Sequence, residues 1–284
     1  MRIRALVVLM LALSLASCAT TPITGRSRLK PLIPLEIELQ LGVDAYAEAK
    51  SMSELISSGL AFEMVQLIGQ RIAVAAEQMI PEPTSTFDWE FILIDEPATA
   101  NAWALPGGKT AVYTGLLPIA RDENGFAVIM GQEIAHAVLQ HGLERITQSL
   151  LLEGTLGLAS MALGDMSASE RDATLQALSG LSSIGIALPF SRLHESEADE
   201  VGLYFAAAAG YDPRAAIGFW ERMVDSNGDG APPEILSTHP SHDTRIADLQ
   251  RWMPTALELY RAGDKELAAC SRRLLRSEKR NCET

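Results

Sequence analysis

Apolar side chains recur at spacings of three and four residues in two stretches near the start of the chain, residues 35–52 and 60–79. This spacing matches the 3.6 residues of a helical turn, so both stretches are predicted to be helices. Aromatic and branched residues then dominate short runs bounded by Pro and Gly, which favours strands. Three strands are expected: 87–94, 100–105 and 109–113.

The second half of the chain has a mainly helical pattern. Helices are expected over 125–144 and 190–209, and the chain from residue 213 onward should form helices joined by loops. Residues 146–187 are rich in Leu, Ala, Gly and Ser and should form two helices, whose acidic residues argue against a transmembrane pair. The order of elements predicts an α+β protein, mainly α, with a small sheet beside the 125–144 helix.

The first residues have the features of an export signal. Two arginines precede an apolar run, Ala5 to Leu15, that is too short to span a bilayer. The next residues match a bacterial lipobox, in which Cys18 becomes the lipidated N-terminus once residues 1–17 are removed; the alternative is an ordinary signal peptide with a chance cysteine. Because Ala19 rather than Asp follows, we expect a lipid anchor in the outer membrane and a chain facing the periplasm.

Punctuation by Pro and Gly divides the rest of the chain, which is long enough for one sizeable core. Residues 18–34 are expected to be an extended linker, residues 35–252 the main domain and residues 253–284 a helical tail. The tail contains Cys270 and Cys282, which could form a disulfide in an oxidising compartment.

Charge excludes one class of partner. The 284 residues carry a formal net charge of -13, with 23 Lys or Arg against 36 Asp or Glu. Nucleic-acid binding requires clustered basic side chains, so we expect no nucleic-acid partner.

The helix expected over 125–144 carries the sequence GQEIAHAVLQHG. It follows the zinc-protease signature His-Glu-x-x-His, except that Gln132 takes the place of the first histidine. Residues four apart lie on one helical face, about 6 Å apart along the axis, so Gln132 and His136 can converge on one ion. Glu133 would then act as a base toward a bound water. The alternative is a helix with a buried polar pair.

A catalytic zinc needs a third protein ligand and one open position. The segment SRLHESEAD offers Glu195 as that ligand, and Asp199 could hydrogen-bond a ligand and fix its orientation. Because Glu197 and Glu200 are acidic too, a solvated helical face is the alternative.

The motifs of this chain occur in an order that resembles the gluzincin metallopeptidases: NAWALPGGKTAVYTGLL, GQEIAHA, SRLHESEAD and STHP. That family, peptidase family M48, contains the CaaX prenyl proteases, HtpX and periplasmic lipoprotein proteases of outer-membrane quality control. The resemblance implies a zincin-like helical domain with a small sheet beside the active-site helix. It also implies one Zn²⁺ ion held by position 132, His136 and Glu195, with Glu133 as the catalytic base.

Gln132 departs from the family pattern. An amide oxygen is a weak zinc ligand compared with imidazole, so we expect poor zinc binding and slow or absent cleavage. His141 lies nine residues after Gln132, roughly half a turn round the helix, and should point away. His239 is the plausible replacement ligand, or else only part of a turn before Pro240. Arg245 is expected at the surface or in an ion pair.

The resemblance further implies an edge strand beside the cleft that pairs with an extended peptide, and the segment NAWALPGG, residues 101–108, resembles that strand. Four residues are expected to belong to it: Gly108, Lys109, Thr110 and Ala111. The function expected is that of a membrane-anchored periplasmic zinc metalloendopeptidase acting on unfolded or misassembled envelope proteins. The alternative is a catalytically inactive relative that binds such proteins in a chaperone-like way.

Overall fold

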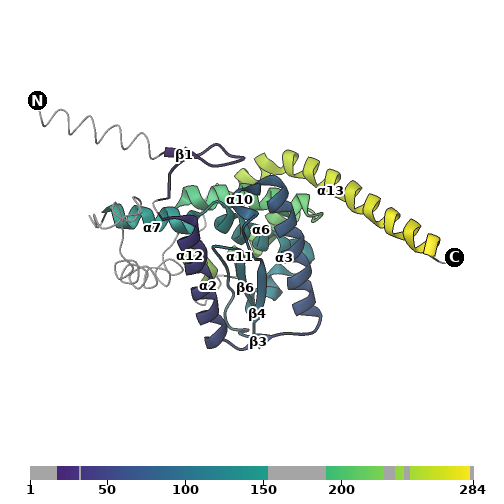
Figure 1. The fold of residues 1–284 in the computed structure, drawn as a ribbon, viewed down its shortest axis with the longest axis horizontal. Coiled ribbons are helices and arrows are strands. Elements are labelled where there is room, and N and C mark those ends of the chain that lie inside the picture. Colours follow the sequence, from purple (N-terminus) through teal and green to yellow (C-terminus); the bar gives the residue numbers. More distant parts are fainter. Residues whose placement is uncertain (1–17, 32, 153–189, 227–233, 240–243, 282–284) are drawn as a thin grey trace, which may run out of the picture.

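The computed structural model describes residues 18–31, 33–152, 190–226, 234–239 and 244–281 (Figure 1). The helices are α2 (Leu35–Met52), α3 (Leu60–Met79), α4 (Pro81–Thr84), the 3-10 turn η1 (Thr114–Leu116), α5 (Leu117–Ala120), α6 (Glu123–Val138), α7 (His141–Leu152), α10 (Arg192–Ala208), α11 (Ala215–Asp225), α12 (Glu234–Thr238) and α13 (Arg245–Asn281). The strands are β1 (Cys18–Thr20), β2 (Ser27–Leu29), β3 (Leu55–Ile56), β4 (Glu90–Ile94), β5 (Ala102–Leu105) and β6 (Lys109–Tyr113). The expected α+β class with a predominance of helix is confirmed.

The main sheet has the strand order β3-β4-β6-β5 and is covered on both faces. Phe91 and Leu93 face the large core shared with α3, α6 and α10. Ile92 and Ile94, which alternate with them, pack with Tyr46 of α2 on the opposite face. Side chains alternate across a strand, so β4 supplies apolar residues to both layers. Figure 1 shows the sheet between α2 and α3.

Several expected boundaries match the structure. Helices expected over 35–52 and 60–79 coincide with α2 and α3, whereas the strand expected from residue 87 begins at Glu90. The expected helices over 146–187 fall mostly on residues 153–189, outside the described part of the chain. The expected boundary between residues 252 and 253 falls inside α13, which is continuous there.

The helix expected over 125–144 is interrupted. α6 ends at Val138, Gln140 has a left-handed backbone with φ of 58°, and α7 starts at His141. Arg28 stabilises the turn between α6 and α7. It donates to the Leu139 carbonyl at 2.6 Å and to Gln140 Oε1 at 3.1 Å. Capping the last carbonyls of α6 in this way lets the chain turn before His141.

Residues 18–34 do not form the expected extended linker. β1 and β2 pair into an antiparallel hairpin, and Thr21 between them is buried. Arg26 of the hairpin forms ion pairs with Glu144 of α7 and Glu197 of α10. The Pro and Gly residues therefore shape a docked hairpin instead of a spacer. The export signal at residues 1–17 and the partner cysteine at residue 282 lie outside the described residues.

Two glycines allow α6 and α10 to cross in close contact. A Cβ added to Gly131 would lie 2.4 Å from the Gly202 carbonyl oxygen, and one added to Gly202 would lie 2.6 Å from the Gln132 backbone nitrogen. Both separations are far below van der Waals contact. This crossing brings the motif residues of the two helices together.

Gly202→Ala is therefore expected to destabilise the protein, by about 1–3 kcal/mol, because the added methyl group has to push two helix backbones apart. Gly142→Ala is the matched control, since a Cβ added there would meet no atom within 4 Å and its φ is not positive. That control should be neutral or stabilising by up to about 1 kcal/mol. Urea unfolding of both variants measures the difference, and equal stabilities would contradict the close-packed crossing.

Candidate metal centre

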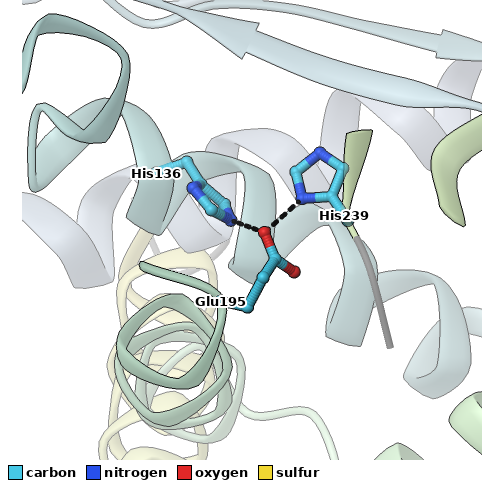
Figure 2. Close-up of side chains that lie close together, drawn as sticks. All are labelled: His136, Glu195 and His239. Carbon is cyan, nitrogen blue, oxygen red and sulfur yellow. Dashed lines mark hydrogen bonds and ion pairs between the residues drawn. The ribbon is translucent and has the colours of Figure 1, made fainter. Parts of the chain in front are cut away.

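Three segments far apart in the sequence bring their polar side chains to one buried place. α6 contributes Glu133 and His136, α10 contributes Glu195, and His239 follows directly after α12 (Figure 2). All four side chains are at most 2% exposed. α6 begins with a side-chain cap, in which Asp122 accepts a hydrogen bond from the Gly125 backbone N–H at 2.9 Å.

Two imidazoles and one carboxylate form a compact cluster. His136 Nε2 lies 3.4 Å and His239 Nδ1 lies 3.1 Å from the same oxygen, Oε1 of Glu195. The candidate ligand atoms of all three residues lie within 4.8 Å of one another. His136 Nε2 is buried and has no hydrogen-bond partner. Two neutral nitrogens and a carboxylate are a donor set that zinc takes in catalytic sites, so the residues present fit that ion.

Glu133 lies beside this cluster and not within it. Its Oε1 is 3.5 Å from His239 Nε2, on the side of the ring away from Glu195. Burial raises the pKa of Glu133 to about 7, and the neighbouring Glu195 adds to the rise, while His239 and the Ala104 backbone N–H oppose it. A carboxyl with a pKa near neutrality can both take up and return a proton.

Gln132 supports the candidate ligand Glu195. Its Nε2 donates to Glu195 Oε2 at 3.1 Å, and Arg245 Nη2 donates to the same oxygen at 2.8 Å. Oε2 is thus occupied by two donors, which leaves Oε1 for the imidazoles. The weak metal ligation expected of Gln132 stays a prediction.

Asp199 was expected to hydrogen-bond a metal ligand and fix its orientation. In the structure it hydrogen-bonds Arg245 instead. Arg245 Nε donates to Asp199 Oδ2 at 2.7 Å, and its guanidinium lies 3.8 Å from the centre of the Trp220 ring. Burial raises the pKa of Asp199 to about 7, although Arg245 opposes that rise. Arg245 was expected at the surface or in an ion pair. It is buried, and it forms an ion pair with Asp199. The position of Arg245 in the sequence, six residues after His239, did not predict that it would be buried.

The expectation that His141 points away from the site is wrong. Its Nδ1 lies 3.1 Å from His136 Nδ1, because the helix ends before His141 and the helical extrapolation no longer applies. His141 also contacts Glu197 and stacks on His194, with ring centroids 4.6 Å apart.

Glu197 was considered in the sequence as part of a solvated acidic face. Burial would raise its pKa, but hydrogen bonds from His141 and the hairpin lower it to about 2.

Of the two segments expected at the edge, NAWALPGG contains the edge strand β5, whereas residues 108–111 do not lie at an edge. Gly108 precedes β6, which contains Lys109, Thr110 and Ala111 and lies between β4 and β5, so its backbone is paired on both sides. Lys109 is buried, and its Nζ donates to Asp88 and to Glu90 at 2.6 Å. These residues therefore hold the sheet together and offer no free edge.

The free edge belongs to β5. The Tyr113 backbone N–H donates to the Asn101 carbonyl, so by alternation residues 101, 103 and 105 face β6. The backbone groups of Ala102 and Ala104 point the other way. β5 lines a pocket whose wall also contains Glu133, His136 and His239. Most of the remaining large lining side chains are apolar, namely Leu41, Trp103, Leu105, Leu143, Ile146 and Phe190, and four are polar or charged, namely Glu38, Asn101, Gln140 and Arg145.

Comparison with known proteins identifies the family of this chain. Residues 60–253, more than half of the chain, match the sequence model of peptidase family M48. The chain belongs to that family. The resemblance drawn from the motifs is thereby confirmed.

Relatives within the family come from eukaryotes and bacteria. The mitochondrial metalloendopeptidase OMA1 of Schizosaccharomyces pombe is 35% identical over 83% of this chain and 66% of its own length. The mitochondrial metalloendopeptidase OMA1 of Homo sapiens is 34% identical over 84% of this chain and 46% of its own. The beta-barrel assembly-enhancing protease of Escherichia coli is 28% identical over 74% and 42%. The chain thus spans between about two fifths and two thirds of these relatives.

The expected periplasmic and outer-membrane location is contradicted by the relatives. Six of them, from fission yeast to Homo sapiens and Arabidopsis thaliana, are named as mitochondrial, which does not agree with a periplasmic location. The lipidation of Cys18 stays a prediction; in the structure this residue starts β1. Within the described residues, no helix has the length and apolar character needed to cross a membrane.

Proposed function

We propose that this M48 protein is a zinc metalloendopeptidase whose ion is held by His136, Glu195 and His239. The observation that carries the proposal is the convergence of these three buried side chains on one point of the pocket wall. A bound zinc ion would lower the pKa of a water molecule and polarise the carbonyl of the scissile peptide bond.

Glu133 is the proton carrier of this proposal. Its carboxylate lies in the wall of the same pocket, next to the cluster, and its pKa of about 7 is suited to exchange at neutral pH. It takes a proton from the attacking water and returns it to the leaving amine, so one residue serves as both general base and general acid.

The neighbouring polar residues orient Glu195. Arg245 and Gln132 both donate to Oε2 and fix the rotation of the carboxylate, while Asp199 fixes Arg245 in turn. A carboxylate held by two donors and left free on one oxygen is suited to binding an ion through that oxygen.

The substrate proposed is an extended segment of an unfolded or misassembled protein. The outward carbonyl groups of Ala102 and Ala104 can accept hydrogen bonds from such a segment at this edge of the sheet. The backbone N–H of Ala102 already donates to Asn101 Oδ1 at 2.9 Å, and that of Ala104 donates to Glu133. The apolar lining of the pocket suits hydrophobic side chains, which folded proteins bury. The names of the relatives, metalloendopeptidases and an assembly-enhancing protease, support a protein substrate.

The test is to measure zinc content and proteolysis on the same preparation of the full chain. We expect one zinc per chain, cleavage of an unfolded protein such as reduced casein, little cleavage of a folded protein, and loss of cleavage on chelation with recovery on adding zinc. Binding of the unfolded protein without cleavage, in a zinc-loaded sample, would instead support the inactive, chaperone-like alternative raised by Gln132.

A further inference from the structure

A second path of buried polar side chains leads from His136 to the N-terminal hairpin. His136 Nδ1 lies 3.1 Å from His141 Nδ1, and His141 Nε2 lies 3.0 Å from Glu197 Oε2. Glu197 Oε2 also accepts a hydrogen bond from Arg26 Nε at 2.5 Å. The path is continuous, and it approaches His136 from the ring nitrogen opposite to the one that faces Glu195.

The donor and acceptor of each link follow from the group at the end of the path. A guanidinium can only donate, so Glu197 is the acceptor toward Arg26. The hydroxyls of Thr21 and Thr24 also donate to this carboxylate, which therefore has no proton of its own to give. Glu197 must then accept from His141, whose N–H is on Nε2.

The same logic fixes the next two rings. A neutral imidazole has one N–H, so a His141 ring that donates from Nε2 can only accept at Nδ1. The atom facing it, Nδ1 of His136, must then be the donor. His136 is left with a lone pair on Nε2, the buried atom without a hydrogen-bond partner that lies 3.4 Å from Glu195 Oε1.

We propose that His141 is a positioning residue, which accepts the Nδ1 proton of His136 and so holds that ring in the tautomer able to bind metal through Nε2. Glu197, fixed by the hairpin, sets the tautomer of His141. The inference rests on the proposed metal centre only in treating His136 as a ligand. Histidine ligands to metals generally donate their other N–H to a fixed acceptor, and His141 supplies that acceptor here.

The rings are also held sterically. The planes of His136 and His141 meet at 79°, an edge contact that suits a hydrogen bond between ring nitrogens. His194 stacks on the His141 face at 20°, and its Nε2 lies 3.3 Å from Glu144. Arg26 donates to Glu144 as well, at 2.7 Å, so one hairpin arginine holds both carboxylates behind the histidines.

The direct test is the tautomeric state of the histidines in zinc-free full-length protein, measured by long-range ¹⁵N NMR correlations of the rings. We expect His136 to carry its proton on Nδ1 and His141 on Nε2. A His136 ring protonated on Nε2 would overturn the inference. This measurement needs no bound metal, so it decides the role of His141 even if the metal-centre proposal fails.

Variants give the second test, with zinc dissociation constants measured by chelator competition. His141→Leu removes the acceptor and should weaken zinc binding roughly 10–100-fold. His141→Gln should stay within a few-fold of the parent, because its amide can accept from His136 and donate to Glu197.

The comparison separates positioning from a general loss of structure. Thermal unfolding of each zinc-free variant is measured alongside. Equal zinc affinity in His141→Leu and the parent, or equal losses in His141→Leu and His141→Gln, would overturn the proposal. Should His141→Leu not fold, Glu197→Gln takes its place. Its amide oxygen must still face Arg26 Nε, which can only donate, and the same atom accepts from His141. An unchanged His136 tautomer is therefore expected, and a mixture of tautomers would count against the proposal.

Discussion

Replacing His239 with alanine is expected to weaken zinc binding by more than about 100-fold and to abolish proteolysis. Losing a partner that merely orients a ligand costs roughly 10–100-fold in affinity or activity, and losing a donor to the ion itself should cost more. His239 is buried, with Nδ1 3.1 Å from the Glu195 oxygen that also faces His136. Without it, two donors remain, fewer than a catalytic zinc site uses.

Gln132→Ala is the matched control for that experiment. It removes a hydrogen bond to Glu195 Oε2, but Arg245 still donates to the same oxygen at 2.8 Å. The loss should therefore not exceed the 10–100-fold expected for an orienting partner. Zinc content after dialysis and dissociation constants from chelator competition compare the two variants. If Gln132→Ala releases the zinc and His239→Ala keeps it, the amide is the third ligand and the ligand set proposed above is incorrect.

Glu133→Gln is expected to lower the turnover number by about 10²–10⁴-fold, the range found for removal of a general base. The amide has nearly the shape of the carboxyl but cannot accept a proton from water. Zinc affinity should change little, because Glu133 lies outside the three-residue cluster and approaches it only through His239 Nε2 at 3.5 Å. Retained metal combined with lost turnover is the distinguishing result.

Steady-state cleavage of a fluorogenic peptide, with zinc measured in the same sample, tests this prediction. An enzyme variant with unchanged turnover would mean that another group takes the proton, and loss of zinc in parallel with turnover would place Glu133 among the ligands. Glu123→Gln, on the first turn of the same helix and away from the pocket lining, controls for removal of a carboxylate from α6.

Local pattern was enough to determine much of the architecture. The bounds of α2 and α3 follow from apolar periodicity, because a helix packed on one side buries every third or fourth residue. The motif helix, the segment carrying Glu195 and the family were likewise evident from short stretches of sequence. These features depend on residues that are close in the chain, where sequence spacing and spatial distance stay proportional.

Tertiary structure decided the features that depend on where helices end and how they cross. Gln140 turns the chain, so His141 returns to His136 instead of continuing round α6. Strand order cannot be derived from strand positions in the sequence, and β5 rather than β6 became the free edge.

Some residues of the site could likewise be identified from the sequence, and others only from the tertiary structure. The sequence by itself determined that Glu133, His136 and Glu195 would meet, because each lies in a recognisable helical motif. The sequence offered His239 as a replacement ligand or as part of a turn, and the tertiary structure placed it at the cluster. Arg245 was placed behind Glu195 by the tertiary structure alone, because no periodicity in the sequence relates it to α10. A buried imidazole or guanidinium is held there by the carboxylates it meets, and those partners become neighbours only when distant helices pack.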